Sequence, residues 1–127
     1  MDVPRILSVE DDVDLQQVIA YVLKKKGWDV AYAYDGKDGL EKATSLKPDL
    51  ILLDMMLPGL NGLEVIEQLK KNPETRTIPV IVMTAYPSDA QFLESSVKSL
   101  GAVEYLAKPV HIDTLVETIE RCLIPPK

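Results

Sequence analysis

Four apolar segments of this sequence are each followed at once by side chains that could do chemistry. These side chains are three consecutive acids at 10–12, Asp54, the pair Thr84 and Ala85, and the pair Lys108 and Pro109. Clustered carboxylates repel each other, by roughly 1–4 kcal/mol for two charges about 4 Å apart, and a hard divalent cation such as Mg²⁺ relieves that repulsion. A lysine ammonium can meet a phosphoryl oxygen as a point charge. Brought together, such a set is typical of phosphoryl transfer onto an aspartate.

The hydrophobic pattern predicts the elements that would position these side chains. Five short apolar segments are typical of strands: Arg5–Val9, Val30–Tyr34, Leu50–Leu53, Val80–Met83 and Val103–Ala107. Five predicted helices alternate with them: Val13–Lys26, a segment from Asp35-Gly36 to Leu46, a segment with Leu63, Ile66 and Leu69 that Asn72-Pro73 ends, Ser88–Leu100 and Ile112–Leu123.

Two of the predicted strands, LILL at 50–53 and VIVM at 80–83, are apolar at every position. Such strands are typical of a parallel sheet that helices cover on both faces. The regular alternation of strands and helices therefore predicts an α/β fold with a doubly wound, five-stranded parallel sheet and five helices. Ligands of such sheets lie outside the carboxyl ends of the strands, which is where the acids, Thr84 and Lys108 are expected to meet.

Length, charge and composition exclude several classes of protein. The 127 residues fit one domain, predicted over 1–127, with 124–127 as a tail or the start of a linker. A net charge of −6 argues against direct binding of nucleic acid and against docking on an anionic membrane. One cysteine and one histidine provide neither an internal disulfide nor a zinc site. With no secretory signal and no membrane span in the sequence, we expect a cytoplasmic domain whose metal is a hard ion held by oxygens.

Several of the polar residues also have purely structural interpretations. Asp12 is expected to cap the helix that follows it, and His111 to form the polar start of the last helix. Cys122 is expected to pack as a small hydrophobe. Asp54 is the hardest to explain in this way, because an acid that closes the LILL strand needs a reason to be there.

Four motifs, ILSVEDD, LILLDMMLPGLNGLEVI, IPVIVMTA and YLAKPV, together resemble the receiver domains of response regulators in two-component signalling. The resemblance extends from Arg5 to Leu123, and each motif falls at a predicted strand end. It implies a flavodoxin-like sheet with the strand order 2-1-3-4-5. It also implies a signalling phosphoacceptor and not an enzyme, a domain that takes a phosphoryl group from a phosphohistidine.

The resemblance implies a role for each matching residue. Asp54 matches the phosphoacceptor. The matching metal ligands are Asp11, Asp54 and the main-chain carbonyl of Met56, with Glu10 acting through water. The residues that match phosphate contacts or the switch are Thr84, Ala85, Lys108 and Tyr105, and the bond between Lys108 and Pro109 is expected to be cis. Mg²⁺ is the implied cofactor, for which Mn²⁺ would substitute.

The implied partners are a histidine kinase or histidine phosphotransfer protein as donor, and a downstream protein or fused effector domain as target. A phosphoryl group adds charge and strong hydrogen-bond acceptors at Asp54. Thr84 is expected to move toward that group and to vacate space that the ring of Tyr105 fills. This motion would remodel the face formed by the fourth helix, the fifth strand and the fifth helix.

Three other functions compete with this interpretation. Phosphatases with an aspartate nucleophile have a second acid two residues on, where this chain has Met56. A flavin- or nucleotide-binding module needs a phosphate cradle after the first strand, where this chain has three acids. A pseudo-receiver, which binds partners without being phosphorylated, is the remaining alternative, and the complete set of site residues argues against it.

Two side chains are predicted to tune how long the phosphoryl group survives. An acyl phosphate is lost when water attacks phosphorus in line, and Met56 and Tyr86 each stand two residues after a site residue, Asp54 and Thr84. Neither is suited to orient that water in the way a glutamine does in GTP hydrolysis. We therefore predict that they shield the phosphoryl group and slow self-dephosphorylation; the alternative is that both merely cover apolar surface.

Overall fold

A computed structural model describes residues 3–84 and 101–123 of the chain. Its five strands are β1 (Arg5–Val9), β2 (Asp29–Ala33), β3 (Leu50–Asp54), β4 (Val80–Thr84) and β5 (Glu104–Ala107). The helices within the described ranges are α1 (Val13–Lys25), α2 (Gly36–Leu46), α3 (Gly62–Lys71) and α5 (Ile112–Leu123). The helix predicted at Ser88–Leu100 and the segment 124–127 lie outside the described residues.

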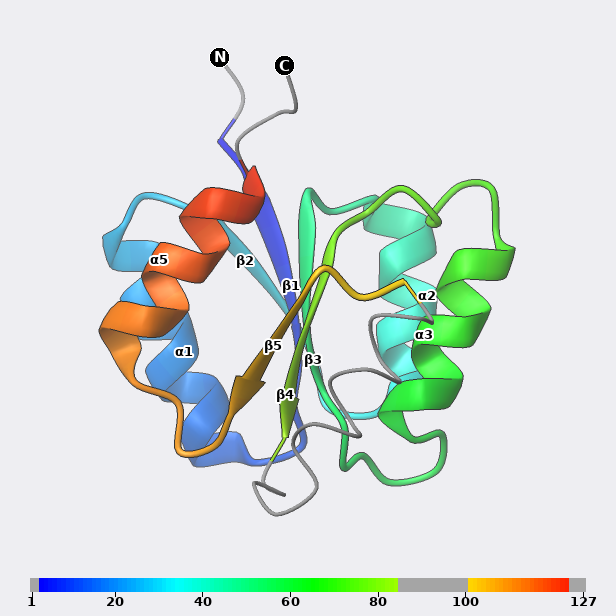
Figure 1. Ribbon diagram of the computed structural model, residues 1–127, viewed down its shortest axis with the longest axis horizontal. Coiled ribbons are helices and arrows are strands. Elements are labelled where there is room, and N and C mark those ends of the chain that lie inside the picture. The colour runs from blue at the N-terminus through cyan, green and yellow to red at the C-terminus, as the bar shows by residue number, and fades with distance from the viewer. Residues whose placement is uncertain (1–2, 85–100, 124–127) are drawn as a thin grey trace.

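The five strands form one parallel sheet in the order β2-β1-β3-β4-β5 (Figure 1). This order confirms the predicted doubly wound architecture. Because all strands run in the same direction, their carboxyl ends lie along one edge. The register there pairs Val9 with Leu53, Asp54 with Met83, and Thr84 with Ala107.

Helices cover both faces of the sheet, with α1 and α5 on one face and α2 and α3 on the other (Figure 1). Strand β3 contributes to both cores by simple alternation. Leu50 and Leu52 pack with residues of α1 and α5, whereas Ile51 and Leu53 pack with residues of α3. All four are at most 1% exposed, so the prediction of a strand buried on both faces is confirmed.

Several predicted boundaries are wrong by one residue. Strands β3 and β4 extend through Asp54 and Thr84, because both residues continue the pairing with the neighbouring strand. Strand β2 begins and ends one residue earlier than predicted. Asp29 is the strand partner of Arg5 in β1, and their side chains form an ion pair of 2.8 Å. This ion pair fixes the register of β2 against β1. Strand β5 begins one residue later, and α1 ends one residue earlier, than predicted.

The local signals at the helix ends act as expected. Asp12 caps α1, since its carboxylate accepts a hydrogen bond of 3.2 Å from the main-chain N–H of Leu15. Gly27, directly after the cap of α1, has a φ of +89°, a conformation that glycine adopts without strain. His111 lies just before α5, where its carbonyl accepts from the N–H of Leu115. Cys122 packs against the core beneath α1 and α5.

Candidate functional site

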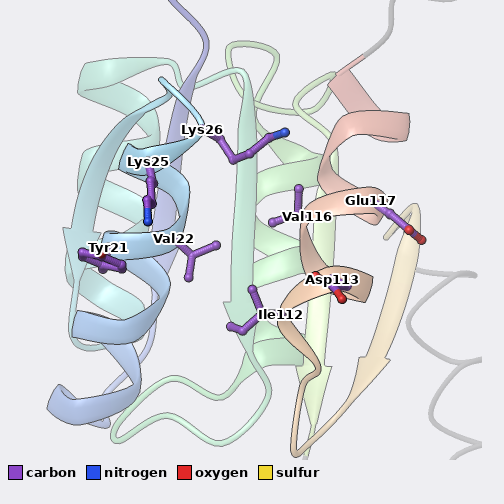
Figure 2. Close-up of a pocket in the computed structure, with 8 residues that line it drawn as sticks. All are labelled: Tyr21, Val22, Lys25, Lys26, Ile112, Asp113, Val116 and Glu117. Carbon is purple, nitrogen blue, oxygen red and sulfur yellow. The ribbon is translucent and has the colours of Figure 1, made fainter.

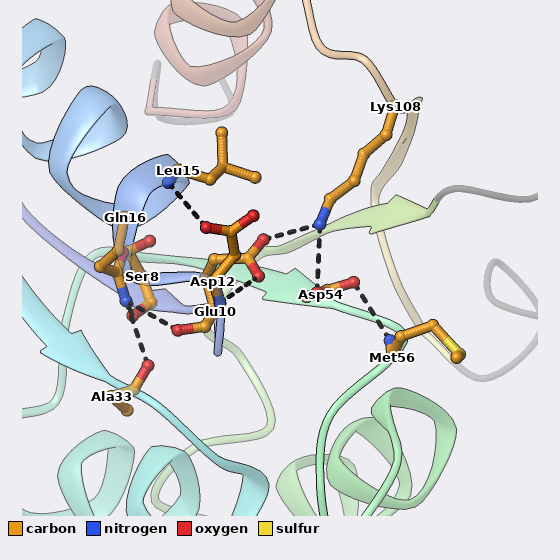
Figure 3. A network of polar contacts seen from close by, with 9 residues as sticks. All are labelled: Ser8, Glu10, Asp12, Leu15, Gln16, Ala33, Asp54, Met56 and Lys108. Atoms are coloured by element: carbon orange, nitrogen blue, oxygen red, sulfur yellow. Dashed lines mark hydrogen bonds and ion pairs between the residues drawn. The ribbon is translucent and has the colours of Figure 1, made fainter.

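Carboxylates from two strand ends meet at the carboxyl edge of the sheet (Figure 3). One oxygen from each of Glu10, Asp11 and Asp54 lies within 4.8 Å of the others. These side chains line a hollow of about 550 Å³, which Lys108 and the loop after β3 also line. The predicted gathering of acids is therefore present, and Lys108 belongs to the same site.

The two carboxylates deepest in the hollow share one cation. Glu10 is fully buried and Asp54 is 3% exposed, whereas Asp11 is exposed. The ammonium nitrogen of Lys108 donates to Oε1 of Glu10 at 2.8 Å and to Oδ2 of Asp54 at 3.1 Å. Lys108 thus supplies counter-charge to both buried acids.

Burial and neighbouring charges shift the pKa values of Glu10 and Lys108. Burial raises the pKa of Glu10 from a usual value near 4.5 to about 7, against the lowering effect of the Lys108 hydrogen bond and the Asp12 N–H. The neighbouring Asp54 raises the pKa of Glu10 further. Burial alone would lower the pKa of Lys108, but its contacts with Glu10 and Asp54 outweigh burial and raise it. The lysine therefore stays charged, while Glu10 resists losing its proton.

Asp54 is held on both sides by hydrogen-bond donors. Its second oxygen, Oδ1, accepts from the main-chain N–H of Met56 at 3.1 Å. Behind it, the start of α3 presses against the end of β3. A Cβ on Gly62 would lie 2.7 Å from Cα of Met55 and 3.1 Å from the carbonyl oxygen of Asp54, so only glycine fits there. The loop after β3 is thereby fixed against the site.

Glu10 is held by contacts to its main chain as well as to its carboxylate. Its N–H donates to the carbonyl of Ala33 at 3.0 Å, and its Oε2 accepts from the N–H of Asp12 at 3.0 Å. Its carbonyl accepts from the side-chain amide of Gln16. Sequence reasoning missed Gln16. The signal was present, since positions 16, 19, 20 and 23 form the buried stripe of α1 and Gln16 is the polar residue on it.

The remaining predicted residues lie near this edge of the sheet or outside the described ranges. Thr84 is fully buried at the end of β4, and its carbonyl accepts from the N–H of Lys108 at 2.6 Å. Tyr105, on β5, packs against the core beneath α2 and α3. The peptide bond between Lys108 and Pro109 is cis. Ala85 and Tyr86 lie outside the described residues.

A second hollow lies away from the acids, between α1 and α5 (Figure 2). It has a volume of about 580 Å³ and is lined by Tyr21, Val22, Lys25, Lys26, Ile112, Asp113, Val116 and Glu117. It contains none of the predicted site residues. The chemistry predicted from the sequence therefore belongs to the hollow at the sheet edge.

The sequence model of the response regulator receiver domain matches residues 6–120. The chain belongs to the response regulator receiver family. Receiver domains act as phosphoacceptors in two-component signalling, and this one has the acidic cluster that suits Mg²⁺. No helix within the described ranges is long and apolar enough to span a membrane.

Two curated relatives differ in how much of their length this chain covers. The response regulator ArlR of Staphylococcus saprophyticus is 43% identical over 119 residues, which are 94% of this chain and 52% of ArlR. Protein PilH of Pseudomonas aeruginosa is 40% identical over 119 residues, which are 94% of this chain and 97% of PilH. The receiver domain thus spans about half the length of one relative and nearly all of the other.

Solved structures of receiver domains share this fold. The receiver domain of the sensor histidine kinase PA1611 from Pseudomonas aeruginosa superposes with a TM-score of 0.85 at 30% identity, covering 96% of this chain and 98% of that one. That structure is described with a magnesium ion coordinated in its active-site cleft. The comparison confirms the flavodoxin-like receiver fold predicted from the sequence.

Proposed function

We propose that this domain takes a phosphoryl group from a phosphohistidine onto Asp54 and switches a partner or an attached output by doing so. The observation that supports this most is the ammonium of Lys108 within hydrogen-bond distance of both Asp54 and Glu10. A pseudo-receiver has no need of such a set. In a pseudo-receiver, the desolvation of two buried acids and a half-buried lysine would be unfavourable and would serve no reaction.

The transfer step is a displacement at phosphorus. A carboxylate oxygen of Asp54 forms the new O–P bond, while the P–N bond of the phosphohistidine breaks and its electron pair returns to the imidazole. Lys108 is already beside Asp54, so its ammonium faces the phosphoryl oxygens as they arrive. Because Asp54 is held by Met56 and Lys108, little reorganisation of the carboxylate is needed.

The donor set of the hollow fits a divalent cation. All the candidate ligand atoms are oxygens, and exposed Asp11 leaves one side open to solvent. In our proposal Asp11, Asp54 and the carbonyl of Met56 hold Mg²⁺, Glu10 acts through water, and Mn²⁺ substitutes. The cation supplies neutralising charge for the transferred phosphoryl group.

The output follows from residues on the two strands beyond β3. Thr84 at the end of β4, with Ala85 after it, and Tyr105 on β5 form the proposed switch. Thr84 donates to the phosphoryl group, and the ring of Tyr105 fills the space that it leaves. The remodelled face, built on the fourth helix, β5 and α5, then binds a downstream protein or a fused effector domain.

The setting we propose is the cytoplasm, where the phosphoryl donor is a histidine kinase or a histidine phosphotransfer protein. The domain itself contacts neither nucleic acid nor membrane in this proposal, which its net charge of −6 supports.

Intact-mass spectrometry after incubation with acetyl phosphate and Mg²⁺ tests this function. One phosphoryl group should be added to the wild type and none to Asp54→Asn. Asp12→Asn is the matched control, because asparagine caps a helix as well as aspartate does and Asp12 serves α1. Phosphorylation that persists in Asp54→Asn, or that is lost in Asp12→Asn alone, would contradict the assignment.

A further inference from the structure

Gln16 is a buried polar residue on α1 that the chemistry described above does not use. Its neighbours on the inner stripe of the helix are Ile19, Ala20 and Leu23, and Gln16 itself is only 1% exposed. A buried amide in an apolar stripe is costly unless it is hydrogen-bonded. Its partners therefore indicate why the position is polar.

The amide nitrogen of Gln16 faces three main-chain carbonyls (Figure 3). It lies 3.0 Å from the oxygen of Ser8, 3.1 Å from that of Ala33 and 3.3 Å from that of Glu10. Carbonyl oxygens only accept, so the nitrogen of the side chain must face them. One side chain thus joins α1 to the carboxyl ends of β1 and β2.

These contacts converge on the main chain of Glu10. The carbonyl of Ala33 accepts from Gln16 and also from the N–H of Glu10, and the carbonyl of Glu10 accepts from Gln16. Between the end of β1 and the start of α1 there are only three residues, 10–12. A shift of the main chain at Glu10 therefore moves the carboxylates of both Glu10 and Asp11.

We propose that Gln16 is a positioning residue for the cation site, which sets the spacing of Glu10 and Asp11 from Asp54 without lining the hollow itself. This rests on the proposed function, in which that hollow holds a divalent cation. Affinity for a cation depends on the orientation of its ligands, and residues that hold ligands in place affect it strongly. Gln16 does so through the backbone of Glu10.

The test compares Gln16→Met with Gln17→Met. Methionine keeps the length of the side chain and removes its donors, and Gln17 is the exposed neighbour on the same helix. Mg²⁺ titrations followed by the NMR signals of the Asp11 and Asp54 amides should give a Kd about tenfold higher for Gln16→Met. The Kd of Gln17→Met should equal that of the wild type, and a Kd within twofold of wild type for Gln16→Met overturns the proposal.

A second measurement on metal-free protein separates positioning from general loss of stability. In Gln16→Met, amide hydrogen exchange should accelerate about tenfold more at Glu10 than at Leu52, a fully buried reference residue in β3. Ile19→Val, which weakens the core of α1, should speed both amides by one factor and leave the Kd unchanged. Equal acceleration of Glu10 and Leu52 in Gln16→Met overturns the proposal.

Wild-type protein provides a third readout in case Gln16→Met does not fold. On addition of Mg²⁺, the side-chain amide signals of Gln16 should shift along with the Asp11 amide, while those of Gln17 stay in place. The proposal is overturned if the Asp11 amide signal shifts on addition of Mg²⁺ while the side-chain amide signals of Gln16 do not. If Mg²⁺ moves no signal of the wild type, the proposed function fails instead, and the exchange of Glu10 still decides whether Gln16 positions it.

Discussion

The ammonium of Lys108 donates to Oδ2 of Asp54 over 3.1 Å although β4 lies between their two strands in the sheet. The lysine reaches across the end of β4, where the carbonyl of Thr84 holds its main-chain N–H. The same ammonium contacts Glu10 on β1's side of Asp54. One side chain therefore joins the ends of three strands, β1, β3 and β5, at the proposed phosphorylation site.

Mg²⁺ should stabilise the fold, because folding gathers Glu10, Asp11 and Asp54 with one lysine to balance them. At ten times its dissociation constant, a ligand that binds only the folded state adds about 1.4 kcal/mol to the free energy of unfolding. Thermal melts with Mg²⁺ and with a chelator measure this. Asp54→Asn should be more stable than the wild type without metal and respond less to it. Identical melting curves for the wild type in the two conditions would count against the cation site.

Lys108→Ala should lower the stability of the metal-free domain by about 2 kcal/mol, because it leaves buried Glu10 and Asp54 without their cation. Metal binding should remain, since the oxygens that ligate it are untouched, while phosphorylation should no longer alter the surroundings of Tyr105. Urea unfolding measures the stability, and the NMR signals of Tyr105 report whether phosphorylation alters its surroundings. Lys71→Ala, at an exposed lysine paired with Glu67, is the control. A Lys108→Ala domain that switches normally would remove the lysine from the mechanism.

Gly62→Ala should destabilise the domain by about 2 kcal/mol, because the added methyl group meets main-chain atoms of Met55 and Asp54 that cannot turn aside. Relief of that clash displaces the loop after β3, so the affinity for Mg²⁺ should also fall. Gly27→Ala is the matched control. Its φ of +89° makes alanine unfavourable, but open space surrounds it and the site is distant. Unfolding and Mg²⁺ titrations on both variants check this; equal Mg²⁺ affinity in Gly62→Ala and wild type would refute the coupling.

The lifetime of the phosphoryl group is predicted to depend on Met56 and Tyr86. Met56 lines the hollow and is 53% exposed. From there we expect its side chain to limit the approach of water. Met56→Asn together with Tyr86→Glu should speed the loss of phosphate by about tenfold, which corresponds to about 1.4 kcal/mol of barrier. Decay of phosphorylated Asp54 at fixed Mg²⁺ is the measurement, and Tyr21→Glu, at an exposed tyrosine on α1, is the control. Equal decay in the double variant and the wild type would rule out shielding.

The alternation of apolar segments and helices was sufficient to predict a parallel sheet with the acids at its carboxyl edge, whereas the strand order was implied by the family resemblance. The LILL strand and the acid that closes it are five consecutive residues, so the burial of one and the placement of the other could be inferred together. The role of Asp12 as a cap was likewise local, because its partner Leu15 is three residues away.

What the sequence could not supply were pairings between distant segments. The register of β2 depends on the meeting of Asp29 with Arg5, 24 positions apart, and Tyr34 looks like a strand residue until that pairing is known. Gln16 looks like one more polar helix residue until its contact with Ala33, 17 positions away, is seen. Periodicity predicts which face of a helix is buried, but not which main-chain carbonyl groups of other segments that face contacts.

The separation of Glu10 and Lys108 by 98 positions bears on how the domain is made. During synthesis the acids leave the ribosome long before the lysine, and contacts between such distant residues form only when the later strands dock. An incomplete nascent chain therefore has the carboxylates but not their balancing charge. In our proposal the acceptor site has its balancing charge only after β5 has joined the sheet, so the site is complete only in the finished fold.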